Sequence, residues 1–122
     1  MSCADLQASI DAEIDTDAPY AIKVTGHFAL LLTRSPGRQE PPYAPLDDVL
    51  QNQIVFELPD AEATITGFRL PEYMAGANAT GYHFHAITAD ERAGGHVLDC
   101  QTASVTVELD RLDSWYVQLS AN

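Results

Sequence analysis

The sequence has few basic residues. Its 122 residues include 6 lysines and arginines against 18 aspartates and glutamates, which gives a formal net charge of −12. A chain this acidic repels the phosphate backbone of nucleic acids and the surface of anionic membranes, so we expect neither as a partner. The acidic residues are scattered along the chain, which is typical of a well-solvated protein surface.

Cysteines and long apolar runs are also scarce. The two cysteines, Cys3 and Cys100, have no cysteine nearby in the sequence, and we expect both to be reduced thiols. No segment approaches the roughly 20 apolar residues of a membrane span. The first residues, MSCADLQASIDAEID, lack the basic start and apolar run of a signal peptide. Together these features predict a cytoplasmic protein.

Hydrophobic residues make up 46% of the chain, which is enough to form a core, and the length suits a single domain over residues 1–122. Leu6, Ile10 and Ile14 recur every four residues and predict an N-terminal helix over residues 4–14. The proline-rich residues 34–45 predict a loop, and 46–53 a short second helix. Strands are expected at 20–33 (with a bend or hairpin at Gly26), 54–58, 63–69, 81–87, 95–101, 104–109 and 115–119. Turns or loops are expected at 59–60, 71–76, 90–94 and 110–114. The predicted fold is α+β and mostly β, with a mixed or antiparallel sheet.

The most informative segment is GYHFHAITADERAGGHVLDC, residues 81–100. His83 and His85 point to the same side of a strand, and a hairpin over residues 88–94 would return His96 beside them. Cross-strand neighbours on one face lie within about 5 Å, so the three imidazoles could share a metal ion. Such a ligand set suits zinc, and also manganese, iron, cobalt, nickel or copper, and leaves positions open as catalytic sites do. The alternative is three structural histidines on a hydrated surface.

Arginine is the second chemical signal. Arg34 and Arg38 lie in TRSPGRQEPPYAPL, residues 33–46, and a guanidinium group binds carboxylates through two parallel hydrogen bonds. The alternative is that both arginines pair with surface acids. Arg69, by contrast, is predicted to be a surface or packing residue.

From residue 20 to about residue 99 the sequence resembles the C-terminal part of the α-acetolactate decarboxylase family. The matching stretches follow the same order as in that family. They are AIKVTGHFALLLTRSPGRQEPPYAPL, the region of Asn52–Gln53 and Val55–Phe56–Glu57, ATITGFRLPEY, GYHFHAI and GGHVLD. Because several motifs occur in order over two-thirds of the chain, the resemblance is far more specific than any one motif.

The resemblance implies a catalytic zinc ion on His83, His85 and His96, with Arg34 in the active site. The family reaction converts a 2-hydroxy-2-methyl-3-oxo acid into acetoin and carbon dioxide. Loss of carbon dioxide leaves an enediolate, whose charge a metal ion stabilises. Arg34 would orient the carboxylate or polarise an oxygen. The implied function is therefore a metal-dependent lyase acting on a small 2-hydroxy-3-oxo acid.

The resemblance also implies two missing acidic groups. Family members are about twice this length, and their catalytic glutamate lies in an N-terminal half that has no counterpart here. An acidic residue of their C-terminal tail is also absent. Glu62 is the first candidate to replace the acid/base, because it directly precedes a matching strand, and Glu57 and Glu40 follow. The more common alternative for each of the three is a solvated surface carboxylate. His27 is predicted to be structural, on the face opposite Arg34.

Several alternatives stay open. The chain could be a shortened relative, one half of a split enzyme, or a homo-oligomer. Of these we expect a homo-oligomer, most simply a dimer, in which a second copy covers exposed sheet. The same residues would also suit an isomerase, a cyclase or an aldol-type enzyme, or a non-catalytic module that binds a metal or ligand. A cupin-like barrel would share the paired histidines, but Glu91 lies too late for the usual cupin glutamate.

Overall fold

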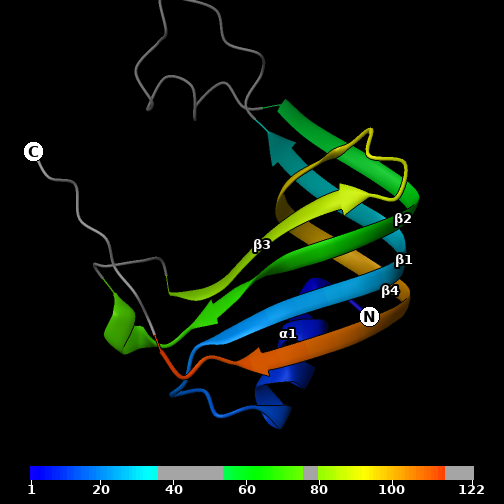
Figure 1. The fold of residues 1–122 in the computed structure, drawn as a ribbon. Coiled ribbons are helices and arrows are strands. Elements are labelled where there is room, and N and C mark those ends of the chain that lie inside the picture. The colour runs from blue at the N-terminus through cyan, green and yellow to red at the C-terminus, as the bar shows by residue number, and fades with distance from the viewer. Residues whose placement is uncertain (36–53, 76–79, 115–122) are drawn as a thin grey trace, which may run out of the picture.

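The computed structural model describes residues 1–35, 54–75 and 80–114, and their strands form a curved antiparallel sheet (Figure 1). The elements in chain order are α1 (Cys3–Glu13), β1 (Tyr20–Ser35), β2 (Ile54–Leu70), the 3-10 helix η1 (Glu72–Met74), β3 (Gly81–Thr88) and β4 (Gly94–Arg111). The order β1-β2-β3-β4 closes into a barrel because β4 pairs with both β3 and β1. In the described part of the chain, no helix is long and apolar enough to cross a membrane.

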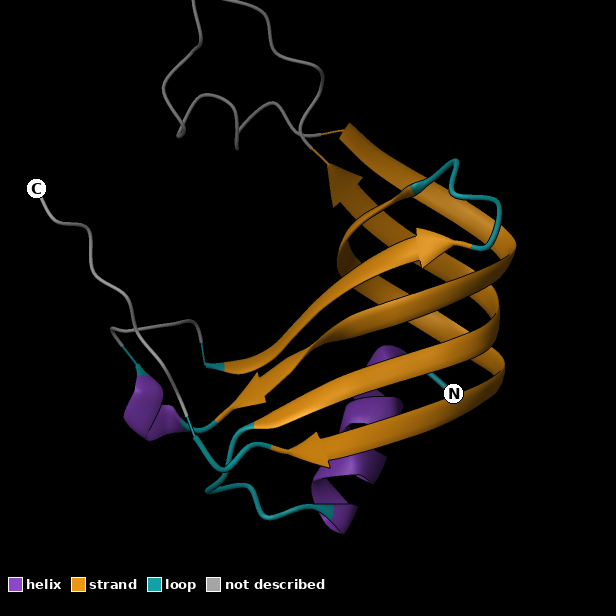
Figure 2. Ribbon diagram, in the orientation of Figure 1, coloured by secondary structure: helices purple, strands orange, loops and turns teal. Residues whose placement is uncertain are grey.

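Helix α1 confirms the predicted N-terminal helix. Ser2 caps it by accepting a hydrogen bond from the backbone N–H of Asp5 at 3.1 Å. The Asp5 carboxylate lies in the first turn, where its negative charge interacts favourably with the positive end of the helix dipole. Leu6 and Ile10 are buried, as their four-residue spacing predicts. They join a core built from the inner sides of the strands and centred on Val24, Phe28, Leu31, Ile65 and Phe84. Figure 2 shows the helix beside the strands that it covers.

The strands are longer than the sequence patterns predicted. Gly26 does not end β1 but bends it, at a φ of 148° that favours glycine. The predicted turn at 59–60 lies inside β2, where Asp60 has a φ of 49° and the pairing with β1 continues on both sides. The two strands predicted at 95–101 and 104–109 form one strand, β4. The residues that we predicted to form turns are therefore local irregularities within continuous strands.

The second helix differs from the expectation. In the described part of the chain, the second helical element is η1, a 3-10 turn that follows Pro71 in a segment predicted as a loop. The short helix predicted at 46–53 and the strand predicted at 115–119 lie outside the described residues.

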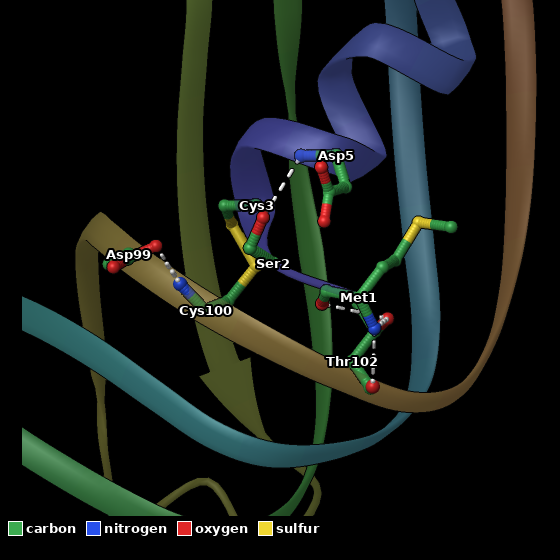
Figure 3. Close-up of a disulfide and its surroundings, with 7 residues drawn as sticks. All are labelled: Met1, Ser2, Cys3, Asp5, Asp99, Cys100 and Thr102. Carbon is green, nitrogen blue, oxygen red and sulfur yellow. Dashed lines mark hydrogen bonds between the residues drawn. A yellow bond between two sulfur atoms is a disulfide. The ribbon is translucent and has the colours of Figure 1, made fainter.

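The two cysteines overturn one prediction. Cys3 and Cys100 are joined in a disulfide, with a Cα–Cα distance of 5.0 Å across 97 residues of sequence (Figure 3). Beside it, Ser2 pairs with Gln101. The expectation of reduced thiols was wrong, because only the docking of α1 on β4 brings the two sulfurs together. Since structural disulfides persist in oxidising compartments, the thiols no longer support a cytoplasmic location.

Polar contacts attach the other end of α1 to the sheet. Arg69 donates a hydrogen bond to the Asp11 carboxylate at 3.0 Å and another to the backbone carbonyl of Thr16 at 2.8 Å. The Tyr82 hydroxyl lies 2.6 Å from the same carboxylate, and burial together with Asp11 raises the pKa of Tyr82. Arg69 is thus a packing residue, as predicted.

Candidate active site

Three histidines lie on one face of the sheet, which we call the histidine face. His83 and His85 alternate with buried Phe84 on β3, and His96 of β4 is the direct register partner of His85. The ring centroid of His96 lies 5.7 Å from that of His85 and 5.8 Å from that of His83. Because residues 89–93 form the turn between β3 and β4, the predicted hairpin geometry is confirmed.

Glycines let the strands approach closely around these histidines. A Cβ atom added to Gly67 of β2 would lie 1.8 Å from the His83 carbonyl oxygen. A Cβ atom on Gly95, which has a φ of 129°, would lie 2.5 Å from the Arg34 carbonyl oxygen. Side chains at these two positions would push the strands apart, so glycine is needed where β2 and β1 meet the histidine-bearing strands.

Arg34 lies next to the histidines. It is the register partner of His96 on the neighbouring strand β1, and its side chain is exposed. Burial lowers the pKa of His96, and the positive charge of Arg34 and the neighbouring His85 and His83 lower it further. A neutral imidazole keeps a nitrogen lone pair, which is the form that binds a metal ion.

The chemistry of this donor set fits a divalent transition metal, since imidazole nitrogens are common ligands of zinc and related ions. In residues 1–35, 54–75 and 80–114, however, no group of three or more His, Cys, Asp or Glu side chains is already arranged to hold a metal ion. Metal binding by these histidines would therefore require their rings to turn toward a common point.

Glu62, the candidate acid/base, lies away from this group. Its carboxylate is hydrogen-bonded to Nδ1 of His27 at 2.8 Å, and Asp60 lies 3.6 Å from the other nitrogen of the same ring. Glu62 is four positions along β2 from Thr66, the register partner of His85, which corresponds to about 13 Å of strand. The structure therefore brings Glu62 together with His27, and not with the three histidines.

The remaining acidic and basic candidates do not complete the site. Glu57 is exposed on β2 as the register partner of Leu32 on β1. Glu40 and Arg38 lie outside the described residues.

Sequence reasoning missed a cavity beside the histidines. It has a volume of about 980 Å³, and its walls include His83 and His85 together with Thr66, Lys23 and Glu108. These residues come from four strands that are far apart in the sequence. The alternation of exposed and buried residues within each strand was the available signal, but it says nothing about which strands are neighbours.

The chain matches the family described as alpha-acetolactate decarboxylase over residues 1–122. It is 44% identical to the alpha-acetolactate decarboxylase of Methanosarcina mazei over 103 residues, which cover 84% of this chain and 36% of that protein. It is 38% identical to the alpha-acetolactate decarboxylase of Raoultella terrigena, covering 100% of this chain and 48% of that protein.

A solved structure of the same family also matches this chain. The crystal structure of alpha-acetolactate decarboxylase from Bacillus subtilis strain 168 superposes with a TM-score of 0.84 at 32% sequence identity. The match covers 92% of this chain and 48% of that protein. The chain thus spans about half the length of the relatives it matches, or less. In sequence and in fold, the chain belongs to the alpha-acetolactate decarboxylase family.

Proposed function

We propose that this protein is a metal-dependent carbon–carbon lyase that decarboxylates a small 2-hydroxy-3-oxo acid, with acetolactate as the first substrate to test. The observation that carries the proposal is the placement of three imidazoles on one face with Arg34 on the adjacent strand. The names of the relatives support a decarboxylase.

His83, His85 and His96 would hold the metal ion, which we expect to be Zn²⁺ or another divalent ion such as Mn²⁺, Fe²⁺ or Ni²⁺. When bound, a divalent ion supplies the positive charge that stabilises negative charge developing on the substrate's oxygen atoms as carbon dioxide leaves. The lowered pKa of His96 supports this role, because it favours the neutral ring, whose nitrogen lone pair can bind a metal ion.

Arg34 would bind and orient the substrate carboxylate. Its exposed guanidinium lies one strand away from His96, so it faces a substrate held at the histidines. A planar guanidinium offers two parallel N–H donors to one carboxylate, which fixes the direction in which carbon dioxide leaves.

The proton that returns to carbon needs a general acid. Because Glu62 is hydrogen-bonded to His27 and far along β2, we propose that the acid comes from a second chain or from residues outside the described ranges. In a homodimer of this kind, each copy would complete the other's site.

The test is to incubate tag-free protein with racemic acetolactate, with and without zinc or manganese, and to quantify acetoin and the metal bound per chain. We expect acetoin formation that depends on metal. His83→Ala removes a ligand and should weaken metal binding by more than about a hundredfold. The matched control is His27→Ala, which removes a histidine outside the group and should leave metal binding intact.

Two results would contradict the proposal. A failure to bind any divalent metal would show that the three histidines do not form a metal site. One metal per chain without acetoin would exclude acetolactate as substrate, and would leave either another 2-hydroxy-3-oxo acid as substrate or a non-catalytic binding module.

A further inference from the structure

Lys23 belongs to a row of side chains that crosses the histidine face. Each member of the row is the register partner of the next on the adjacent strand, so all of them point to the same side of the sheet. The row runs Arg34, His96, His85, Thr66, Lys23, and continues to Glu108 on β4. The three histidines are therefore flanked by a cation on each side, although the protein as a whole is strongly acidic.

Lys23, unlike Arg69 and Arg111, has no ion-pair partner among the residues that the structure describes. Arg69 pairs with Asp11, and Arg111 lies 3.5 Å from the Asp15 carboxylate. Lys23 is exposed and forms no ion pair with any described carboxylate. An ammonium group in this position is available to an anionic ligand.

The same cavity holds Lys23, Thr66, His83 and His85. Lys23 and His85 stand two strands apart, so their Cα atoms are separated by about 10 Å. The flexible four-carbon stem of the lysine can carry its ammonium group into this space. A ligand of a few carbon atoms would therefore span the distance between the histidines and the lysine.

Two carboxylates define the outer limit of this space. Glu108, the register partner of Lys23, and Asp110 lie on the next strand, on the side of Lys23 away from the histidines, and both line the cavity. An anion between Lys23 and the histidines is attracted by the lysine, while one beyond Lys23 is repelled by the two acids.

We propose that Lys23 binds a second carboxylate of the substrate, so that this protein prefers a 2-hydroxy-3-oxo acid carrying an acidic side chain. The inference rests on the proposed function, in which the metal ion and Arg34 bind the reacting end. In acetolactate the groups remote from the reacting carboxylate are methyl groups, which give Lys23 no partner. Lys23 is thus a specificity residue and takes no part in bond breaking.

The test compares the binding of succinate and butyrate to the zinc-loaded and the metal-free protein by calorimetry. Both probes have four carbon atoms, and they differ by one carboxylate. We expect succinate to bind about fivefold to tenfold more tightly, as one charged hydrogen bond at a partly exposed site would give. Lys23→Met should abolish the difference and Lys23→Arg should keep it. Arg92→Met is the matched control, because it removes the same charge from the β3–β4 turn and should leave the preference intact.

The outcomes separate this inference from the proposed function. If Lys23→Met keeps the preference for succinate, or if Arg92→Met loses it equally, the inference is overturned even when zinc binds as proposed. If the protein fails to bind zinc but the preference for succinate still depends on Lys23, the anion site at Lys23 is supported and the proposed metal site is rejected.

Discussion

Glu62 shows how one hydrogen bond changes the interpretation of a single residue. Its place before a strand of the family motif made it the first candidate for an acid/base. In the structure its carboxylate is bound to His27, and Asp60 lies on the other side of the same ring. This carboxylate joins β2 to β1 through a cross-strand hydrogen bond and lies about 13 Å along β2 from Thr66.

We predict that Glu62→Gln changes the rate of acetoin formation by less than about twofold. Its effect on the free energy of unfolding should be below about 1 kcal/mol, because the pair that it disrupts is exposed to solvent. Urea unfolding and acetoin assays check both values. Arg34→Gln is the comparison, and we expect a much larger loss of activity from it. A hundredfold fall in kcat for Glu62→Gln would instead restore its assignment as the general acid.

At the scale of elements, α1 is held to the sheet at both ends. The disulfide joins Cys3 at its start to Cys100 on β4, and Asp11 near its end contacts Arg69 and Tyr82. Between these two attachments, Leu6 and Ile10 fill the core under the strands. The strand that the disulfide joins to the helix, β4, also carries His96, one of the proposed metal ligands.

The disulfide should therefore contribute strongly to stability. Closing a loop of about a hundred residues reduces the entropy of the unfolded chain, and its loss should cost about 2–5 kcal/mol of unfolding free energy. Urea unfolding with and without a reducing agent measures this cost. The Cys3→Ser/Cys100→Ser double variant serves as the control, since its stability should match the reduced protein and should not respond to reductant. Equal stability of the oxidised and reduced wild-type protein would contradict the prediction.

At the scale of the whole molecule, exposed apolar side chains stand out against the acidic surface. Among the described residues, the large hydrophobic side chains on the strands that are exposed include Ile54, Val55, Phe68, Ile87 and Leu98. Apolar surface of this kind commonly marks an interface between proteins. The high net negative charge opposes association of two copies, so an apolar contact between them would have to outweigh repulsion.

We predict a dimer in sedimentation experiments, with an association that strengthens as salt is raised, because salt screens the repulsion between the acidic copies. Ile87→Glu places a charge at a residue that is 49% exposed on β3 and should shift the population toward monomer. Ala29→Glu adds the same charge at another exposed position, on β1, and should weaken the dimer less. A monomer at every protein and salt concentration would exclude self-association as the source of the general acid.

The sequence by itself determined the features that depend on short-range periodicity. The four-residue spacing of Leu6 and Ile10 specified helix α1, and the two-residue period of strands placed His83 and His85 on one face. The glycine-bounded turn then specified that His96 would return beside His85. These patterns are local, because side-chain direction follows directly from helix or strand geometry.

Only the tertiary structure decided which distant residues meet. Strand pairing placed Arg34 and Lys23 on either side of the histidines in one row and separated Glu62 from the histidines. The docking of α1 on β4 brought together two cysteines 97 residues apart. The physical reason is that register and packing arise from contacts between segments far apart in the chain. A period of two or of 3.6 residues specifies the face on which a side chain lies, but not its neighbour on that face.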